Sequence, residues 1–269
     1  IKSNLMYLGR TDLDPTKEFI INKNKILKKE LNYTPALVKM INEIIDNSVD
    51  NLKNTKKAKI NVILSEDSVS VKDNGSGIPI STIKDLNNED VLIPFSCWGM
   101  AKAGSNFNDD DIDETTIGTN GVGSYCTNVL STFFLGRTND GIKEFECIWT
   151  NNAENSEVKV KDSILNSTKG TYVEFKPDLS RLGSENISKD VYSVIEQRLI
   201  NLSVSYPNIK FLFNGKLIKY SRQDMINMLG SNSEIYEDDK YCIAVLPNND
   251  NEFKCFTIVN GLNMKGGNH

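Results

Sequence analysis

Residues 35–52 carry the pattern that most restricts the fold of this chain. Apolar side chains recur there at steps of three and four residues, at Leu37, Ile41, Ile44, Ile45 and Leu52. This spacing predicts an amphipathic helix, and Pro35 suits its first turn because the fixed φ of proline is already helical. A helix with one apolar stripe must bury that stripe against another layer.

Short alternating segments after this helix predict the other layer. Residues 60–64 and 68–72 flank a polar turn and read as a β-hairpin of two half-buried strands. Further strand-like segments lie at 143–149, 171–175, 211–217, 241–246 and 253–259, and helical spacing returns at 189–204. Residues 1–34 are polar and irregular. We expect an α+β fold, in which a mixed or antiparallel sheet is covered by helices.

The single histidine, His269, excludes several kinds of catalytic site. A Ser-His-Asp triad, a HExxH zinc site and a phospho-accepting histidine within the chain all need a histidine elsewhere. A general base must therefore be a carboxylate, Lys, Tyr or Cys. The five cysteines form no CxxC pair.

Charge and hydropathy restrict the partners. The formal net charge is −5, and Lys56, Lys57 and Lys59 are the nearest approach to a basic cluster, which a solvated helix end also explains. Because a DNA-holding surface needs a row of cations, we expect weak DNA contact or none from this chain. No apolar run approaches the roughly 18 residues of a membrane span. We expect a cytoplasmic chain with no membrane partner.

The first motif lies on the predicted helix. Glu43, Asn47 and Asp50 share one face, and Asp46 lies beside them. Such a polar face is usually just solvated. An asparagine flanked by acids nevertheless supplies the hard oxygen ligands that magnesium prefers.

The second motif is Asp73-Asn74-Gly75-Ser76-Gly77-Ile78-Pro79, directly after a predicted strand. Asp73 offers an acceptor at the strand end for an amino group, while Gly75 and Gly77 permit positive φ and the close approach of a flat ring. A tight β-turn would explain only the Asn-Gly step.

Two further glycine elements follow. Residues 117–124 read Ile-Gly-Thr-Asn-Gly-Val-Gly-Ser and precede an apolar run that extends to Leu135 and begins as a possible helix. Glycines before a helix expose backbone N–H groups as an anion cradle. No GK[ST] follows, so this is not a Walker A loop. Thr168-Lys169-Gly170-Thr171 leads into a predicted strand and says little alone.

Together, in this order, these four elements resemble the N-box and the three glycine motifs of the GHKL ATPases. The stretch from Gly118 to Ser131, GTNGVGSYCTNVLS, is similar to the topoisomerase version, in which a helix ends in Asn-x-x-Ser. Met6-Tyr7-Leu8-Gly9, residues 102–107 and the end of the chain also resemble topoisomerase segments. The resemblance covers almost the whole chain and is strongest to the large subunits of T-even-type bacteriophage enzymes.

The resemblance implies roles residue by residue. Glu43 would be the catalytic base, and Asn47 would bind both the nucleotide and Mg²⁺. Asp73 would accept the adenine amino group of ATP. The remaining nucleotide-binding positions would be Gly75, Gly77, Ile78, Ser105, Asn106, Asn120, Gly121, Val122, Gly123, Ser124 and Thr171. Residues 1–230 would form the ATP-binding domain, and residues 231–269 would begin the transducer domain.

The implied function is nucleotide-gated self-dimerisation that drives DNA strand passage by a type II topoisomerase, together with its other subunits. DNA would be held through the full-length enzyme. The family's partner-reaching N-terminal arm and its transducer lysine have no counterpart here, and Tyr125 replaces a phosphate-facing lysine. The acidic segment Asn108–Glu114 is either a lid or a solvated loop.

Three alternatives remain. Another GHKL machine, such as a mismatch-repair ATPase or a chaperone, would share the fold, although repair proteins carry a GFRGEAL-like second glycine motif. A nucleotide-dependent dimerisation module would bind without turnover. An α+β domain whose glycines serve only as turns would require four ordered coincidences.

Overall fold

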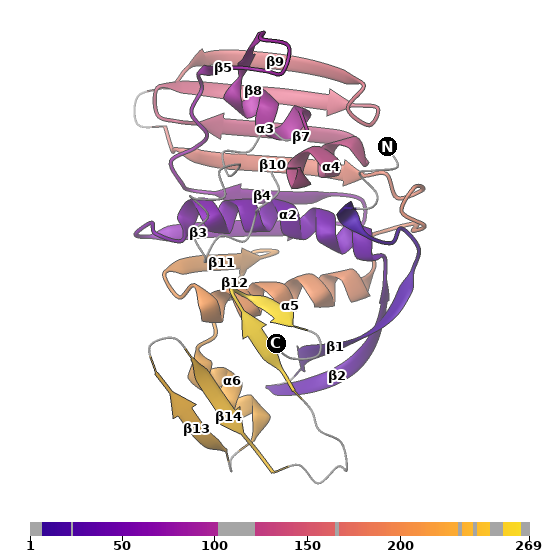
Figure 1. Ribbon diagram of the computed structural model, residues 1–269, viewed down its shortest axis with the longest axis vertical. Helices are drawn as coiled ribbons and strands as arrows, with labels where there is room; N and C mark the ends of the chain where they lie inside the picture. Colours follow the sequence, from indigo (N-terminus) through magenta and orange to yellow (C-terminus); the bar gives the residue numbers. More distant parts are fainter. Residues whose placement is uncertain are drawn as a thin grey trace.

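The computed structural model describes residues 7–22, 24–101, 122–164, 167–230, 233–238, 241–247 and 255–264. An eight-stranded sheet forms one layer, and helices cover one of its faces (Figure 1). Its strands are β3 (Ala58–Leu64), β4 (Val69–Asp73), β7 (Ser131–Asn139), β8 (Lys143–Thr150), β9 (Asn155–Asp162), β10 (Gly170–Pro177), β11 (Ile209–Phe213) and β12 (Lys216–Ile218). The expected α+β architecture is confirmed.

The order across the sheet is β12-β11-β3-β4-β10-β7-β8-β9. β11 runs parallel to β3, and the other neighbouring pairs of this sheet are antiparallel. The sheet is therefore mixed, as predicted. Chain order and spatial order differ most at the centre, where the β3–β4 hairpin lies between β11 and β10.

The helices are α2 (Pro35–Leu52), α3 (Ile93–Gly99), α4 (Gly123–Val129), α5 (Lys189–Ser205) and α6 (Arg222–Leu229). α2 has the bounds that its periodicity predicts, and it buries Leu37, Ile41, Ile45 and Leu52 completely. These side chains meet the apolar faces of β3 and β4, which alternate buried and exposed residues. Burial of this stripe is the main reason that the helix forms, because isolated helices of this length are marginal in water.

Four two-stranded hairpins complete the described chain. They pair β1 (Asp14–Asn22) with β2 (Lys25–Tyr33), β5 (Thr82–Lys84) with β6 (Asp90–Leu92), β13 (Glu234–Glu237) with β14 (Cys242–Val245), and β15 (Thr257–Val259) with β16 (Leu262–Met264). No helix within the described ranges has both the length and the apolar character that a membrane crossing requires.

One expectation for local structure was wrong. The supposedly irregular N-terminal region contains β1 and β2, which contact α5 through hydrogen bonds from Ile21 N to Gln197 Oε1 (2.7 Å) and from Asn32 N to Asp190 Oδ2 (2.9 Å). These long-range contacts compensate for a polar sequence with little strand propensity. The apolar run through Leu135 begins as a helix, as expected, and continues as β7 from Ser131.

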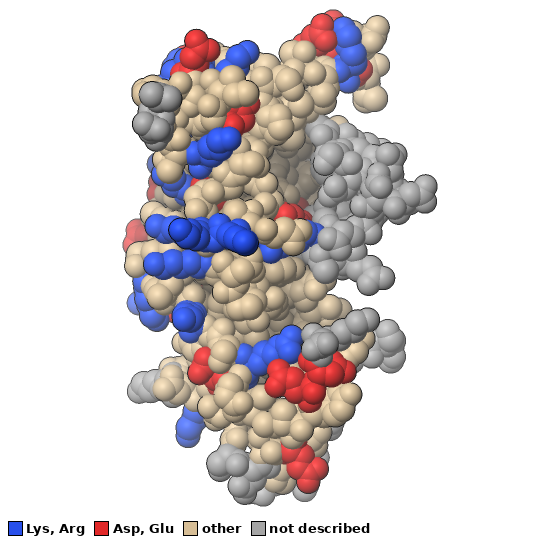
Figure 2. Space-filling model, turned by 90° about the vertical axis from the view of Figure 1, so that its left-hand side faces the viewer, with Lys and Arg blue, Asp and Glu red and all other residues tan. Residues whose placement is uncertain are grey.

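The face of the large sheet opposite these helices is open among the described elements. Side chains that point to this face, such as Lys59, Ile63 and Lys72, are exposed, while their neighbours on the helical face are buried. Figure 2 views the molecule from the end where β3 begins and β4 ends, and Lys and Arg side chains gather at mid-height there.

A buried ion pair joins α2 to α5. Arg198 Nη2 donates to Asp46 Oδ1 at 2.6 Å, and both side chains are more than nine-tenths buried. The Arg198 Nε and Nη1 atoms have no hydrogen-bond partner among the described residues. Asp46 lies on the same helix as Glu43 and Asn47, so this pair fixes the rotation of α2 against its neighbour.

Removing one partner of this pair should destabilise the fold strongly. We expect Asp46→Ala to lower the free energy of unfolding by about 3–5 kcal/mol, because it leaves a buried guanidinium without a counter-charge. Urea unfolding followed by circular dichroism measures this loss. The exposed pair Lys216–Glu196, at 3.2 Å, provides the control, and Lys216→Ala should cost less than about 1 kcal/mol. Equal losses in the two variants would contradict a structural role for the buried pair.

Candidate functional site

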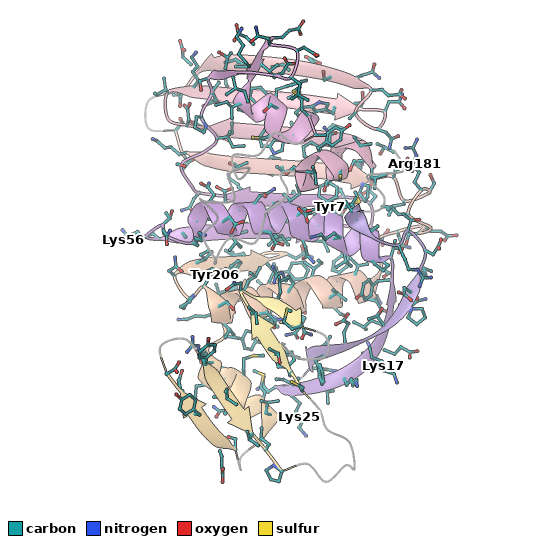
Figure 3. All side chains as sticks on the ribbon, in the orientation of Figure 1. Tyr7, Lys17, Lys25, Lys56, Arg181 and Tyr206 are labelled. Carbon is teal, nitrogen blue, oxygen red and sulfur yellow. The ribbon has the colours of Figure 1, made fainter. Side chains whose placement is uncertain are left out.

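Glu43 is a buried carboxylate at the centre of α2. Its Oε1 accepts a hydrogen bond from Tyr7 Oη at 3.1 Å and forms an ion pair with Lys39, one helical turn earlier. The Lys39 ammonium also lies 5.4 Å from the centre of the Tyr7 ring. In Figure 3, Tyr7 lies against α2 beside α4. Two side chains, Tyr7 and Lys39, thus hold one oxygen of Glu43 in a fixed place.

The other carboxylate oxygen of Glu43 faces the first turn of α4. A Cβ atom at Gly123 would overlap Glu43 Oε2, so only glycine permits this close approach. Glycine at this position therefore brings a carboxylate against the backbone at the start of α4. A water molecule activated there would lie beside backbone N–H groups, which suits an anion.

Asn47 lies one turn after Glu43 and contacts the same short helix. Its Nδ2 donates to Ser124 Oγ at 2.8 Å. This bond orients the amide so that Oδ1, which accepts no hydrogen bond from the described residues, is available as a hard oxygen ligand. The structure thus brings together Glu43, Asn47, Gly123 and Ser124, which the sequence analysis placed on two separate motifs.

The sequence of α4 explains how it is held in this position. Thr127 Oγ1 donates to Gly123 O at 2.9 Å, Asn128 Nδ2 donates to Trp98 O at 3.0 Å, and Ser131 Oγ donates to Thr127 O at 2.6 Å. The Asn-x-x-Ser ending of this helix is therefore structural: Asn128 attaches it to α3, and Ser131 closes its last turn.

Asp73 forms a second centre at the end of β4. Its Oδ1 accepts hydrogen bonds from Gly75 N (2.8 Å) and Thr171 N (3.3 Å), and Ser48 Oγ lies 3.3 Å from Oδ2. Burial raises the pKa of this carboxyl group, and the three hydrogen bonds oppose the rise. None of the described Lys or Arg residues forms an ion pair with Asp73, so a neutral donor such as an amino group is its natural partner.

The glycine segment after Asp73 folds against the end of β7. Gly77 has φ +77°, and a Cβ atom there would overlap the carbonyl oxygen of Asn139. Ile78 N then donates to Thr138 Oγ1 at 2.7 Å, and Thr138 Oγ1 lies 3.3 Å from Gly170 O. Gly77, Ile78 and the Gly170–Thr171 step therefore surround one region, with Asp73 at its base.

Gly75 is packed for a different reason. A Cβ atom there would overlap the Asn51 side chain and lie 3.1 Å from Asp73 Oδ1. The glycine thus lets the backbone N–H turn back to the carboxylate.

Several predicted positions lie outside the described residues. These are Ser105, Asn106, Asn120 and Gly121, together with the acidic segment 108–114. Val122 is described, and its carbonyl oxygen accepts from Cys126 N at 2.9 Å as α4 begins.

The sequence did not reveal the partners of Glu43, nor that Ser48 contacts Asp73. Lys39 lies four residues before Glu43, and helical spacing alone would have shown that the two side chains meet. Tyr7 lies within a segment already noted for its resemblance, but its 36-residue separation from Glu43 hid the contact. Thr138, which accepts a hydrogen bond from Ile78 N, lies on a strand near a turn, and no sequence pattern marks it as part of the site.

The Gly123→Ala substitution should lower the reaction rate without unfolding α4. The new methyl group would displace the Glu43 carboxylate, and a shift of about 1 Å in a reacting group costs on the order of 10²-fold in rate. We therefore expect the rate of the reaction catalysed at this site to fall by about that factor. The hydrogen bonds of Thr127 and Asn128 should keep α4 in place. Steady-state rates and thermal melting measure the two effects. A variant with unchanged rate would mean that Glu43 takes no part in the reaction.

Comparison with known proteins identifies a family and several relatives of this chain. Residues 32–181 match the family described as Histidine kinase-, DNA gyrase B-, and HSP90-like ATPase. The DNA topoisomerase large subunit of Enterobacteria phage T4 is 36% identical over 271 residues, which cover 100% of this chain and 51% of that protein. DNA topoisomerase 2 of Drosophila melanogaster is 29% identical over 98% of this chain and 19% of its own length.

A solved structure has the same fold. The ATPase region of Saccharomyces cerevisiae topoisomerase II bound to ICRF-187 (dexrazoxane) superposes with a TM-score of 0.84 at 25% identity, over 95% of this chain and 70% of that one. The chain spans about half the length of the phage relative and a smaller part of the others. Because the family match covers more than half of its residues, this chain belongs to the histidine kinase-, DNA gyrase B- and HSP90-like ATPase family.

Proposed function

We propose that this chain binds ATP with Mg²⁺ and hydrolyses it as the ATPase part of a type II DNA topoisomerase. The observation that carries the proposal is the position of Glu43, a buried carboxylate that Tyr7 and Lys39 hold against Gly123. A carboxylate fixed beside the backbone at the start of a helix can orient a water molecule toward a phosphate at that helix.

Asp73 would recognise the adenine ring. Its buried carboxylate would accept a hydrogen bond from the exocyclic amino group, since it has no cation partner among the described residues. Gly75, Gly77, Ile78 and Thr171 would line the ring, with the Gly77 backbone close to Asn139. A buried acceptor of this kind discriminates well, because a base without the amino group leaves it unsatisfied.

The phosphates would lie at the other centre. The backbone of Val122, Gly123 and Ser124 begins α4 without a side-chain cap, so its N–H groups would face the triphosphate. Asn47 would contribute its Oδ1 to Mg²⁺. No three or more histidine, cysteine or acidic side chains in the described part of the chain are grouped to hold a metal ion, so the nucleotide and water would supply most ligands. When bound, Mg²⁺ would offset the phosphate charge.

The assignment to a topoisomerase rests on relatives. The phage T4 and Drosophila proteins that resemble this chain over nearly its whole length are both named DNA topoisomerases. Accordingly, ATP binding would bring two copies together, and the parent protein would use this closure to pass one DNA duplex through another. DNA and the other subunits are then its partners.

Isothermal titration with a non-hydrolysable ATP analogue and Mg²⁺ tests the binding step on this chain. We expect saturable binding that weakens when guanine replaces adenine. A folded sample that binds neither nucleotide would overturn the proposal.

The topoisomerase assignment needs the full-length protein. With it, ATP should support relaxation of supercoiled plasmid, and the non-hydrolysable analogue should not support repeated cycles. Turnover of ATP without any change in DNA topology would instead favour another machine of the same ATPase family.

A further inference from the structure

A cavity of about 600 Å³ lies at the open face of the large sheet, away from the helices. It touches the backbone behind Asp73 and Thr171 but opens on the opposite side from Glu43 and α2. Its walls carry five cationic side chains, Lys72, Arg137, Lys159, Lys161 and Lys169. The described site does not use any of these five.

The register of the sheet places three of these cations in one straight row. Across β4, β10, β7, β8 and β9, the paired residues are Lys72, Tyr172, Arg137, Glu146 and Lys159. Beyond Lys72 the paired residue on β3 is Asn61, and Lys59, two residues earlier on β3, lies beside the row with its partner Lys210 on β11. The basic row is the set of seven cationic residues on this face: Lys59, Lys72, Arg137, Lys159, Lys161, Lys169 and Lys210.

The acidic residues near the basic row neutralise only part of it. Arg137 Nε lies 2.5 Å from Glu146, Lys161 lies 3.0 Å from Glu144, and Lys159 lies 2.9 Å from Glu157. Lys59, Lys72, Lys169 and Lys210 are exposed and form no ion pair with another described residue, although Asp140 lies near enough to Lys169 to feel its charge. A positive surface remains on a chain whose net charge is −5.

The length of the row indicates the kind of ligand. From β11 to β9 there are six inter-strand steps of about 4.8 Å each, which makes roughly 29 Å. Duplex DNA rises about 3.4 Å per base pair, so this length spans about eight base pairs. A small anion would contact two or three of these cations, whereas a duplex backbone would contact the row from end to end. The Arg137 guanidinium, 5.9 Å from the Tyr172 ring centre, is also held in place.

We propose that the basic row is a binding surface for the phosphate backbone of duplex DNA. This inference deepens the proposed function and depends on it for its biological meaning, because a topoisomerase handles DNA. It also changes the expectation of weak DNA contact or none, since cations that are scattered through the sequence meet only after the strands pair. Phosphate contacts of this kind position DNA without reading its sequence.

Fluorescence anisotropy with a labelled 20-base-pair duplex, from about 50 to 200 mM salt, tests the surface. We expect binding at low salt that falls steeply as salt rises. The double variant Lys72→Gln, Lys210→Gln removes two exposed cations without an ion pair and should lower the slope of log K against log salt by about 2. The matched control, Lys84→Gln with Lys176→Gln, removes the same charge at residues paired with Asp90 and Asp67.

Two results would overturn the inference: no binding at low salt by the folded wild-type chain, or equal losses in the test and control variants. The nucleotide titration on the same sample keeps the two proposals apart. Nucleotide binding without DNA binding contradicts only the basic row. DNA binding without nucleotide binding contradicts the proposed function and leaves the surface itself supported.

Discussion

In the Glu43→Gln variant we expect ATP hydrolysis to fall by about 10²–10⁴-fold while nucleotide binding is retained. The amide keeps the shape of the carboxylate and can still accept from Tyr7, but it cannot take a proton from water. The loss should appear in kcat, because the interaction with the attacking water matters only in the transition state. Rates with saturating ATP and titration with the non-hydrolysable analogue measure the two quantities.

The supporting side chains provide a graded comparison. Tyr7→Phe removes the 3.1 Å bond to Glu43 Oε1 but leaves Lys39 in contact, so its effect on kcat should be smaller. A Glu43→Gln enzyme that retained the wild-type rate would contradict the assignment of Glu43 as the catalytic base. A Tyr7→Phe effect as large as that of Glu43→Gln would mean that the tyrosine itself takes part in proton transfer.

Asp73→Ala should have the largest effect on nucleotide affinity. A hydrogen bond to a buried charged group contributes about 1.5–3 kcal/mol, so we expect the Kd for the ATP analogue to rise about 10- to 100-fold. The GTP analogue, which lacks the amino donor at that position, should lose much less. Calorimetric titration of both nucleotides checks this, and an equal loss for the two would show that Asp73 does not recognise the base.

The same carboxyl group predicts a dependence on pH. Burial raises its pKa above 3.8 in the folded protein, so between the unfolded and folded values the folded state binds the proton more readily. Stability therefore falls as pH rises through that window, and at neutral pH the full cost of burying the charge is present. Asp73→Asn removes this cost, and we expect it to unfold at no lower urea concentration than wild type at pH 7, even though adenine binding is impaired.

The parts of the fold that sequence predicts are those set by local patterns. α2 follows from the spacing of Leu37, Ile41 and Ile45, and the β3–β4 hairpin follows from strict alternation around a polar turn. β1 and β2 could not be predicted in this way, because their sequences are rich in Lys, Asn and Glu and are held by α5. Tertiary contact, not propensity, decides such segments.

The site was predictable to the extent that each motif carries its own chemistry. Residue type and spacing predict Asn47 as a magnesium ligand and Asp73 as an acceptor for an amino group, whereas the role of Glu43 comes from the family resemblance, and all three roles stay predictions. Their convergence was not predictable from periodicity, since Thr171 N reaches Asp73 across 98 residues of sequence. The basic row could not be predicted from the sequence for the same reason. Its cations lie on separate strands, and only the pairing of those strands brings them together.

The position of the β3–β4 hairpin at the centre of the sheet has a consequence for how the protein is made. β4 ends at Asp73, but its partner β10 ends at Pro177, and the parallel neighbour of β3 ends only at Phe213. At about 5–20 residues per second, a ribosome needs on the order of 5–20 s to deliver β10 after β4. During that interval both edges of an apolar hairpin lack their native neighbours on the nascent chain, which makes this interval the one most exposed to aggregation. Faster translation, or a chaperone that shields the hairpin, should therefore raise the yield of folded protein more than stabilising the finished sheet would.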